Sequence, residues 1–180
     1  MNSVIRLRPL TALDDETIAN WPPYPAEFES LDYALRADGW LTEFGHRSDA
    51  WLYTAEHGGE PVAFSLLAMT APGEAEFRIA LRADKTALGL GGAVTQETLR
   101  QGFGARGLTR IHLMVRTNHP RACALYRRLG FILRGECRQT VNRRPTDFYL
   151  MEILRAAYLG GIDPALHPIP PGAIPKPPGG

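Results

Sequence analysis

The sequence predicts a mixed α/β fold, with a central sheet covered by helices on both faces. Apolar residues alternate in some segments and recur at helical spacing in others, in the order β-α-α-β-β-β-α-β-α-β-β. With 180 residues, 44% of them apolar and 22% charged, the chain has the length and composition of one domain with a substantial core.

The elements of the first half are separated by clear turn signals. Trp21-Pro22-Pro23-Tyr24-Pro25 ends the first helix, and His57-Gly58-Gly59-Glu60 is typical of a hairpin turn. The expected elements are a strand at Ser3–Leu7 ending at Pro9, helices at Asp14–Ala19 and Ala26–Ala37, a hairpin of Ala50–Glu56 with Val62–Thr70, and a strand at Glu74–Leu81.

In the second half, strands and helices alternate before a closing pair of strands. Gly89-Leu90-Gly91-Gly92 opens a helix, and Pro120 suits the first position of another. The expected elements are helices to about Phe103 and from Pro120 to Leu129, and strands at Ile111–Val115, Phe131–Cys137 and Phe148–Leu154.

We expect a domain at residues 1–159 and a separate tail at residues 160–180. The tail holds seven of the fifteen prolines and five glycines, a composition that disfavours packed helices and strands. It is either a flexible tail or an extended arm whose isoleucines lie against a neighbouring surface. The second alternative makes a homodimer plausible.

Composition also limits location and partners. The chain has no run of 18 apolar residues, and its N-terminus lacks the apolar segment of a signal peptide, so we expect a cytoplasmic protein without membrane contact. Cys123 and Cys137 are too few for a disulfide framework, and no Cys/His spacing indicates a metal. We expect Cys123 in the core and His112 as a packed residue.

Charge is divided unevenly along the chain. Residues 1–80 hold 5 basic and 13 acidic residues, a net −8, whereas residues 81–180 hold 15 and 6, a net +9. Either the two halves neutralise each other in one fold, or a split site holds an anion in one half and a cation in the other. The acidic first half argues against a nucleic-acid partner.

The segment from Glu76 to Phe103 carries a strand, a glycine-rich loop and a helix. Free backbone N–H groups at the start of such a helix suit a diphosphate, although the glycines equally suit a tight turn. The loop lacks the Gly-Lys-Ser/Thr ending of a nucleoside-triphosphate loop and the G-x-G-x-x-G of a dinucleotide fold.

A second motif indicates what the loop binds. The run from Asn118 to Phe131 resembles the N-x-x-[AS]-x-x-L-Y-x-x-x-G-F signature of the GNAT superfamily of acyl-CoA-dependent N-acyltransferases. Thr86-Ala87-Leu88-Gly89-Leu90-Gly91 resembles the family's Q/R-x-x-G-x-G/A motif, with Thr86 in place of Gln or Arg. Glu76 and the closing strands resemble the ribosomal-protein and polyamine N-acetyltransferase branch.

The resemblance implies a mostly antiparallel central sheet with a V-shaped splay between the fourth and fifth strands, and acetyl-CoA in the gap. Pantetheine would pair with the strand edge at Ile79, Ala80 and Leu81. The diphosphate would lie on the loop residues Ala87, Leu88, Gly89, Leu90, Gly91 and Gly92. Asn118 would bind pantetheine or only cap the strand, and Arg121 would bind the 3′-phosphate or only face solvent.

The resemblance also assigns the chemistry. Tyr126 would protonate the leaving thiolate, or else be a core aromatic residue. Alternation places Glu76 on the face opposite Phe77, where it is a general base, an ammonium anchor, or the ion-pair partner of Arg78.

The acceptor would be a primary amine that attacks acetyl-CoA directly: a protein N-terminus, a polyamine or another cationic amine. Six aromatic residues and five carboxylates between Trp21 and Phe44 suit such a cation, although most of these aromatics belong to the core. The alternative function is a non-catalytic acyl-CoA-binding or interaction module.

Overall fold

A seven-stranded sheet forms the centre of the molecule. The computed structural model describes residues 4–36 and 38–160, and the strand order is β1-β2-β3-β4-β5-β7-β6. The strands are β1 (Arg6–Pro9), β2 (Ala50–His57), β3 (Glu60–Ala71), β4 (Glu74–Leu81), β5 (Arg110–Arg116), β6 (Ile132–Val141) and β7 (Arg144–Leu154). Each neighbouring pair is antiparallel except β4 and β5. The predicted mostly antiparallel α/β sheet is confirmed.

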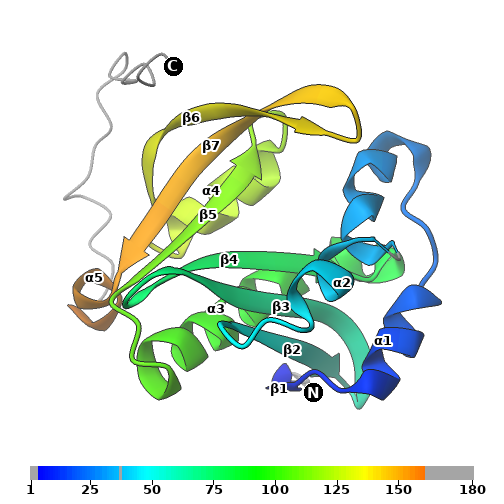
Figure 1. Ribbon diagram of the computed structural model, residues 1–180, viewed down its shortest axis with the longest axis horizontal. Helices are drawn as coiled ribbons and strands as arrows, with labels where there is room; N and C mark the ends of the chain where they lie inside the picture. The colour runs from blue at the N-terminus through cyan, green and yellow to red at the C-terminus, as the bar shows by residue number, and fades with distance from the viewer. Residues whose placement is uncertain (1–3, 37, 161–180) are drawn as a thin grey trace.

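The sheet divides at its one parallel pair. β4 and β5 are paired at three positions, from Glu74 opposite Arg110 to Glu76 opposite His112. Beyond Glu76 the two strands diverge into an open V (Figure 1). On its other edge β4 stays paired with β3 as far as Leu81. The predicted splay between the fourth and fifth strands is confirmed.

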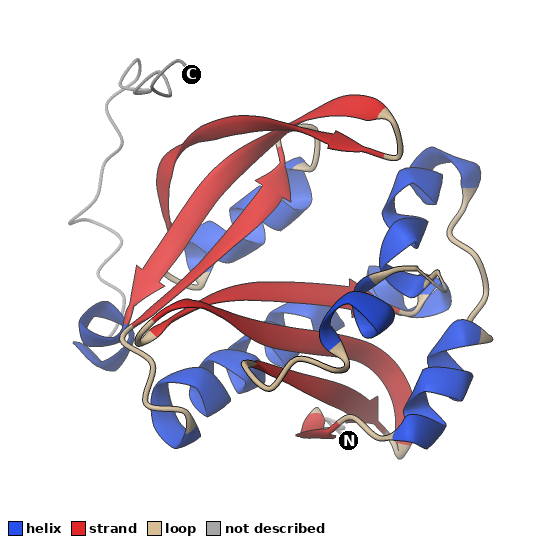
Figure 2. Cartoon of the chain, in the orientation of Figure 1, coloured by secondary structure: helices blue, strands red, loops and turns tan. Residues whose placement is uncertain are grey.

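Helices cover both faces of the sheet, as predicted (Figure 2). The first face carries α1 (Ala12–Ala19), the 3-10 helix η1 (Ala26–Leu35) and α2 (Trp40–Phe44). The remaining helical segments are η2 (Ala83–Leu88), α3 (Leu90–Arg100), the π-helical turn η3 (Gln101–Ala105), α4 (Pro120–Arg128) and α5 (Arg155–Gly160). Of these, α3 and α4 pack on the second face.

Alternation along β4 assigns its side chains to the two layers. Ala75 and Phe77 are buried with Leu99 and Phe103, beneath α3 and η3. Ala80 belongs instead to the cluster of Trp40 and its neighbours on the first face. The two faces of β4 therefore meet separate hydrophobic clusters, and the polar residues between them lie on the first face.

The structure departs from the sequence prediction mainly at helix ends. The expected long helix to Phe103 ends as α3 at Arg100 and continues as η3, where Gly102 lies against β5. A Cβ at Gly102 would come within 2.6 Å of Ile111 Cδ1, so the close approach needs glycine. The sequence analysis missed α2, η2 and α5. The expectations for Ser3, Ala37 and residues 161–180 lie outside the described residues, and so does the proposed arm of the homodimer.

No helix in the described ranges is long and apolar enough to cross a membrane.

Candidate functional site

The end of β4 presents a backbone edge that no strand covers. Pairing with β5 stops at Glu76, three residues before the predicted pantetheine-binding segment Ile79–Leu81. The Leu81 carbonyl on this edge accepts a hydrogen bond from the Tyr24 hydroxyl. Burial raises the pKa of Tyr24 to about 12, so this hydroxyl is a donor at neutral pH. The sequence analysis placed Tyr24 only among the aromatic residues of the acceptor cluster, and it missed this contact because nothing in the sequence indicates one so distant along the chain.

The predicted phosphate loop ends at the N-terminus of α3. Gly89 adopts a left-handed conformation with φ 72°, which turns the chain from η2 into α3. The first turn of α3 contains no acidic side chain, so nothing there opposes the partial positive charge of the helix end.

The remaining loop residues have structural contacts as well. Leu90 is buried, whereas the side chain of Leu88 is exposed. Gly91 and Gly92 face Leu125 of α4, and a Cβ at Gly92 would lie 3.2 Å from Leu125 Cδ1. Both interpretations of the glycines, a tight turn and an exposed backbone, are therefore compatible with the loop. Ala87 lies in η2, and the Thr86 hydroxyl donates a hydrogen bond to the Ala83 carbonyl at 3.0 Å.

Tyr126 lies in the core beneath β4. Its ring packs edge-on against Phe77 and Phe131, with centroids 6.3 and 5.6 Å away. Its hydroxyl has no hydrogen-bond partner within the described part of the chain, and burial raises the pKa of Tyr126 well above its usual value. Cys123 is also buried, and burial raises the pKa of its thiol, so the expectation of a core cysteine is confirmed.

Glu76 lies on the opposite face of β4 and is paired. Its carboxylate accepts two hydrogen bonds from Arg78, at 3.1 and 3.2 Å. The Arg78 guanidinium also lies over the rings of Phe44 and Trp40, 4.7 and 5.4 Å from their centroids. The ion pair that the sequence left as one alternative for Glu76 is present. Trp40 and Phe44, two of the six aromatic residues expected to suit an acceptor cation, therefore already lie against a cation of the chain itself.

His112 is a titratable group that the sequence analysis placed among packed residues. It lies opposite Glu76 in the parallel pair, where the V begins, and its Nε2 is 2.9 Å from Thr70 Oγ1. Burial and the charge of Arg110 lower the pKa of His112, so the ring is neutral at pH 7. Its alternation with the buried Ile111 and Leu113 was the signal that it shares the face of Glu76.

A groove of about 570 Å³ opens where η1, the end of β5 and the β6–β7 hairpin approach one another. We call it the η1–hairpin groove. Asn118, a predicted pantetheine ligand, is exposed and lines this groove. Arg121 is exposed on the first turn of α4 and lies outside it. The groove includes residues from three distant parts of the sequence, and for that reason sequence patterns did not find it.

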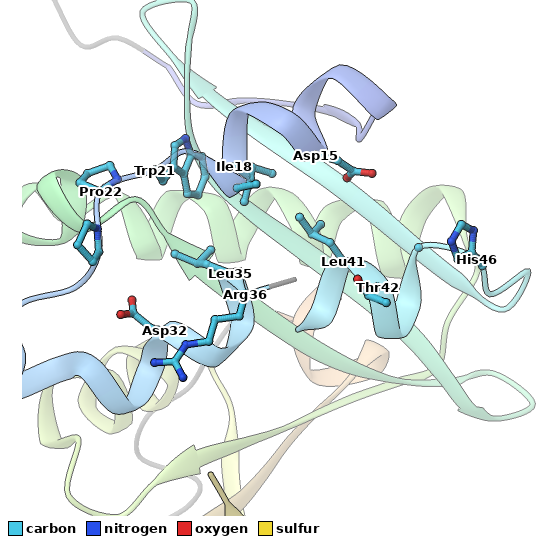
Figure 3. Close-up of a pocket in the computed structure, with 13 residues that line it drawn as sticks. Asp15, Ile18, Trp21, Pro22, Asp32, Leu35, Arg36, Leu41, Thr42 and His46 are labelled. Atoms are coloured by element: carbon cyan, nitrogen blue, oxygen red, sulfur yellow. The ribbon is translucent and has the colours of Figure 1, made fainter. Parts of the chain in front are cut away.

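A second pocket, of about 580 Å³, lies between α1, η1 and α2 (Figure 3). Ile18, Leu35 and Leu41 form its apolar part, and Asp15 and His46 lie at one end. The predicted catalytic and acetyl-CoA-binding residues do not line this pocket, but Trp21 and Asp32 of the expected acceptor cluster do. Within residues 4–36 and 38–160, no group of three or more His, Cys, Asp or Glu side chains is placed to hold a metal ion.

Comparison with known proteins identifies the family to which this chain belongs. The sequence model of the acetyltransferase (GNAT) family matches residues 13–131, more than half of the chain. The chain belongs to the GNAT family. It is therefore an acyl-CoA-dependent N-acetyltransferase. The sheet that opens between β4 and β5, together with α3 and the glycine at its start, is the GNAT fold. No curated protein gives a significant match.

Solved structures of GNAT enzymes share this fold. A chimera of spermidine N-acetyltransferase SpeG from Vibrio cholerae and hSSAT has a TM-score of 0.74 at 22% identity, covering 88% of this chain and 100% of that chain. A second such chimera has a TM-score of 0.70 at 25% identity, covering 87% and 99%. SpeG from Vibrio cholerae in complex with CoA and spermine has a TM-score of 0.72 at 21% identity, covering 86% and 98%. These matches agree with the resemblance to the polyamine branch.

Proposed function

We propose that the chain transfers an acetyl group from acetyl-CoA to a primary amine by direct attack. The observation that carries the proposal is the uncovered edge of β4, which leads to the glycine-headed N-terminus of α3. An amide-bearing chain adds to such an edge as a strand does, and a diphosphate suits the N–H groups of the helix end. The residues present thus fit acetyl-CoA as the acyl donor.

The reaction forms one bond and breaks another. The amine nitrogen bonds to the thioester carbonyl carbon, the C–S bond breaks, and the thiolate takes a proton. Tyr126 supplies this proton, because burial keeps its phenol protonated at neutral pH. The backbone N–H near Leu81 stabilises the oxyanion of the tetrahedral intermediate.

A base must remove the amine proton, because a primary amine is mostly protonated at pH 7. Glu76 takes this proton through a water molecule, after its carboxylate exchanges the hydrogen bonds from Arg78 for one from the water. The neutral ring of His112, beside Glu76, is a second candidate for this role. Glu76 and Tyr126 lie on opposite faces of β4, which suits an amine arriving from one face and a thiolate protonated from the other.

The test is thiol release from acetyl-CoA by the purified chain, across amino acids, peptides, polyamines and aminoglycosides. We expect release with at least one class, and a product heavier than the amine by one acetyl group in mass spectrometry. Binding of acetyl-CoA is measured separately by calorimetry. Acetyl-CoA binding without release on any amine would instead support the alternative, a non-catalytic acyl-CoA-binding module.

A further inference from the structure

We propose that the amine accepted by this site also carries an anionic group, a carboxylate or a phosphate, that the η1–hairpin groove binds. The inference rests on the proposed function and concerns the same site. It is carried by the position of the groove, by its charges and by the occupied aromatic faces on the side of Glu76.

The groove opens on the face of the sheet from which the amine would arrive. Arg116 follows His112 by four residues on β5, so alternation places both on the same face, the face of Glu76. Tyr33 of η1 lies near both Arg78, beside Glu76, and Arg116, in the groove. Burial raises the pKa of Tyr33, and the charges of both arginines act to lower it. In Figure 1, η1 and the turn of the β6–β7 hairpin both lie at the open end of the V.

The lining of the groove is predominantly cationic. Arg36 of η1's C-terminal end, Arg116 of β5 and Arg144 of β7 contribute three guanidinium groups. Of the two carboxylates in the lining, Asp147 is bound through both oxygens to Arg138, at 2.6 and 3.0 Å. Glu29 is then the remaining carboxylate, and the exposed guanidinium groups of Arg36 and Arg144 line the groove with it. Planar guanidinium groups suit bidentate binding of carboxylate and phosphate.

The aromatic rings nearest Glu76 do not favour a second ammonium in place of an anion. The faces of Trp40 and Phe44, which would otherwise suit a second ammonium, already hold Arg78.

The experiment compares amines that differ only in the anion. Lysine is paired with cadaverine, and phosphoethanolamine with ethanolamine, and kcat/KM is measured for each with saturating acetyl-CoA. For the wild type we expect a preference of about tenfold or more for the anionic member of at least one pair, as for a hydrogen bond to a charged group. The pair that shows it distinguishes carboxylate from phosphate.

Two variants of the same hairpin test where the preference arises. Arg144→Gln removes a charge from the groove, and the preference should fall toward one. Arg143→Gln removes a charge from the adjacent turn position, which does not line the groove, and the preference should remain. The two variants change net charge equally, so a general electrostatic effect would move both together.

Three outcomes would overturn the inference. Preference for cadaverine and ethanolamine in the wild type would do so while leaving the proposed function intact. A rise in only the KM for acetyl-CoA in Arg144→Gln, with the preference unchanged, would assign the arginines to the donor phosphates. Absence of thiol release with every amine would contradict the inference and the proposed function together.

Discussion

The two sides of the proposed transfer site are built from different chemical groups. On the donor side, the β4 edge and the start of α3 present backbone groups, supported by the packed rings of Phe77 and Tyr126. On the acceptor side, the η1–hairpin groove presents exposed charged side chains. A backbone site depends little on side-chain identity, whereas a side-chain site changes its ligand with a few substitutions.

This difference explains how Thr86 is compatible with the donor motif. Its hydroxyl is turned toward the Ala83 carbonyl, within the loop itself, and the N–H groups of the α3 terminus do not depend on it. On the proposed acceptor side, by contrast, replacing Arg36 or Arg144 would change the ligand-binding groups themselves. In the proposed site, the donor is therefore set by the fold and the acceptor by the individual chain.

The largest expected effect is on the donor side, at Tyr126. Tyr126→Phe should lower kcat on the order of 10²-fold, because the thiolate loses its proton donor. Acetyl-CoA binding should be unchanged in calorimetry. The hydroxyl has no partner in the described part of the chain, so the free energy of unfolding should change by less than about 0.5 kcal/mol.

The control is Tyr158→Phe, a tyrosine whose ring packs on Phe103, far from β4 along the chain. It should keep full activity. If Tyr126→Phe is as active as the wild type, Tyr126 is a core aromatic residue only, and the donor side holds the substrate without supplying a proton.

The next effect tests how rigid the packing behind the donor side is. Gly102→Ala places a Cβ within 2.6 Å of Ile111 Cδ1 and 3.0 Å of Leu67 Cδ1. We expect the free energy of unfolding to fall by about 1–3 kcal/mol in urea denaturation. Gly104→Ala lies in the same π-helical turn with no atom within 4 Å, and should be neutral. Equal effects of both variants would show that the turn, and not the close approach to β5, requires glycine.

A smaller effect is expected where the two sides meet. Tyr24→Phe removes the hydrogen bond that joins the segment before η1 to the Leu81 carbonyl of β4. The free energy of unfolding should fall by about 1 kcal/mol, the usual net contribution of such a bond. Tyr149→Phe, a half-buried tyrosine without a hydrogen bond in the described ranges, is the control. If pantetheine needs the Leu81 carbonyl, Tyr24→Phe should bind acetyl-CoA more tightly instead of more weakly, because the carbonyl is then no longer bonded to the Tyr24 hydroxyl.

The secondary structure of the proposed donor side was largely predictable from the sequence, whereas the groove on the proposed acceptor side was not. The β4–α3 segment is continuous in sequence, so alternation could assign Phe77 to the core and the glycine motif could mark Gly89 at the start of α3. The groove depends on Arg36, Arg116 and Arg144, which come together only through tertiary structure. The acidic and aromatic first half suggested a cation site, but Arg78 from β4 already lies over two of its rings, Trp40 and Phe44, and local patterns do not show such a contact.

The smallest effect concerns His112, on the acceptor face. Burial lowers its pKa in the folded chain, so the unfolded state binds more protons once the pH falls below about 6.5. Stability should therefore decline between pH 7.5 and pH 5, and His112→Gln should remove a part of this decline on the order of 0.5 kcal/mol. His119, whose pKa burial also lowers, contributes equally to both proteins, so the difference between their urea titrations isolates His112.

The charged groups that face His112 decide the sign of this difference. Arg110 lowers its pKa together with burial, whereas Glu74, Glu76 and Glu152 raise it. If the wild type gains stability relative to His112→Gln as the pH falls, the three carboxylates dominate and the ring is protonated near neutral pH. His112 would then act as a further cation on the acceptor face, beside the arginines of the groove, and Glu76 would remain as the base.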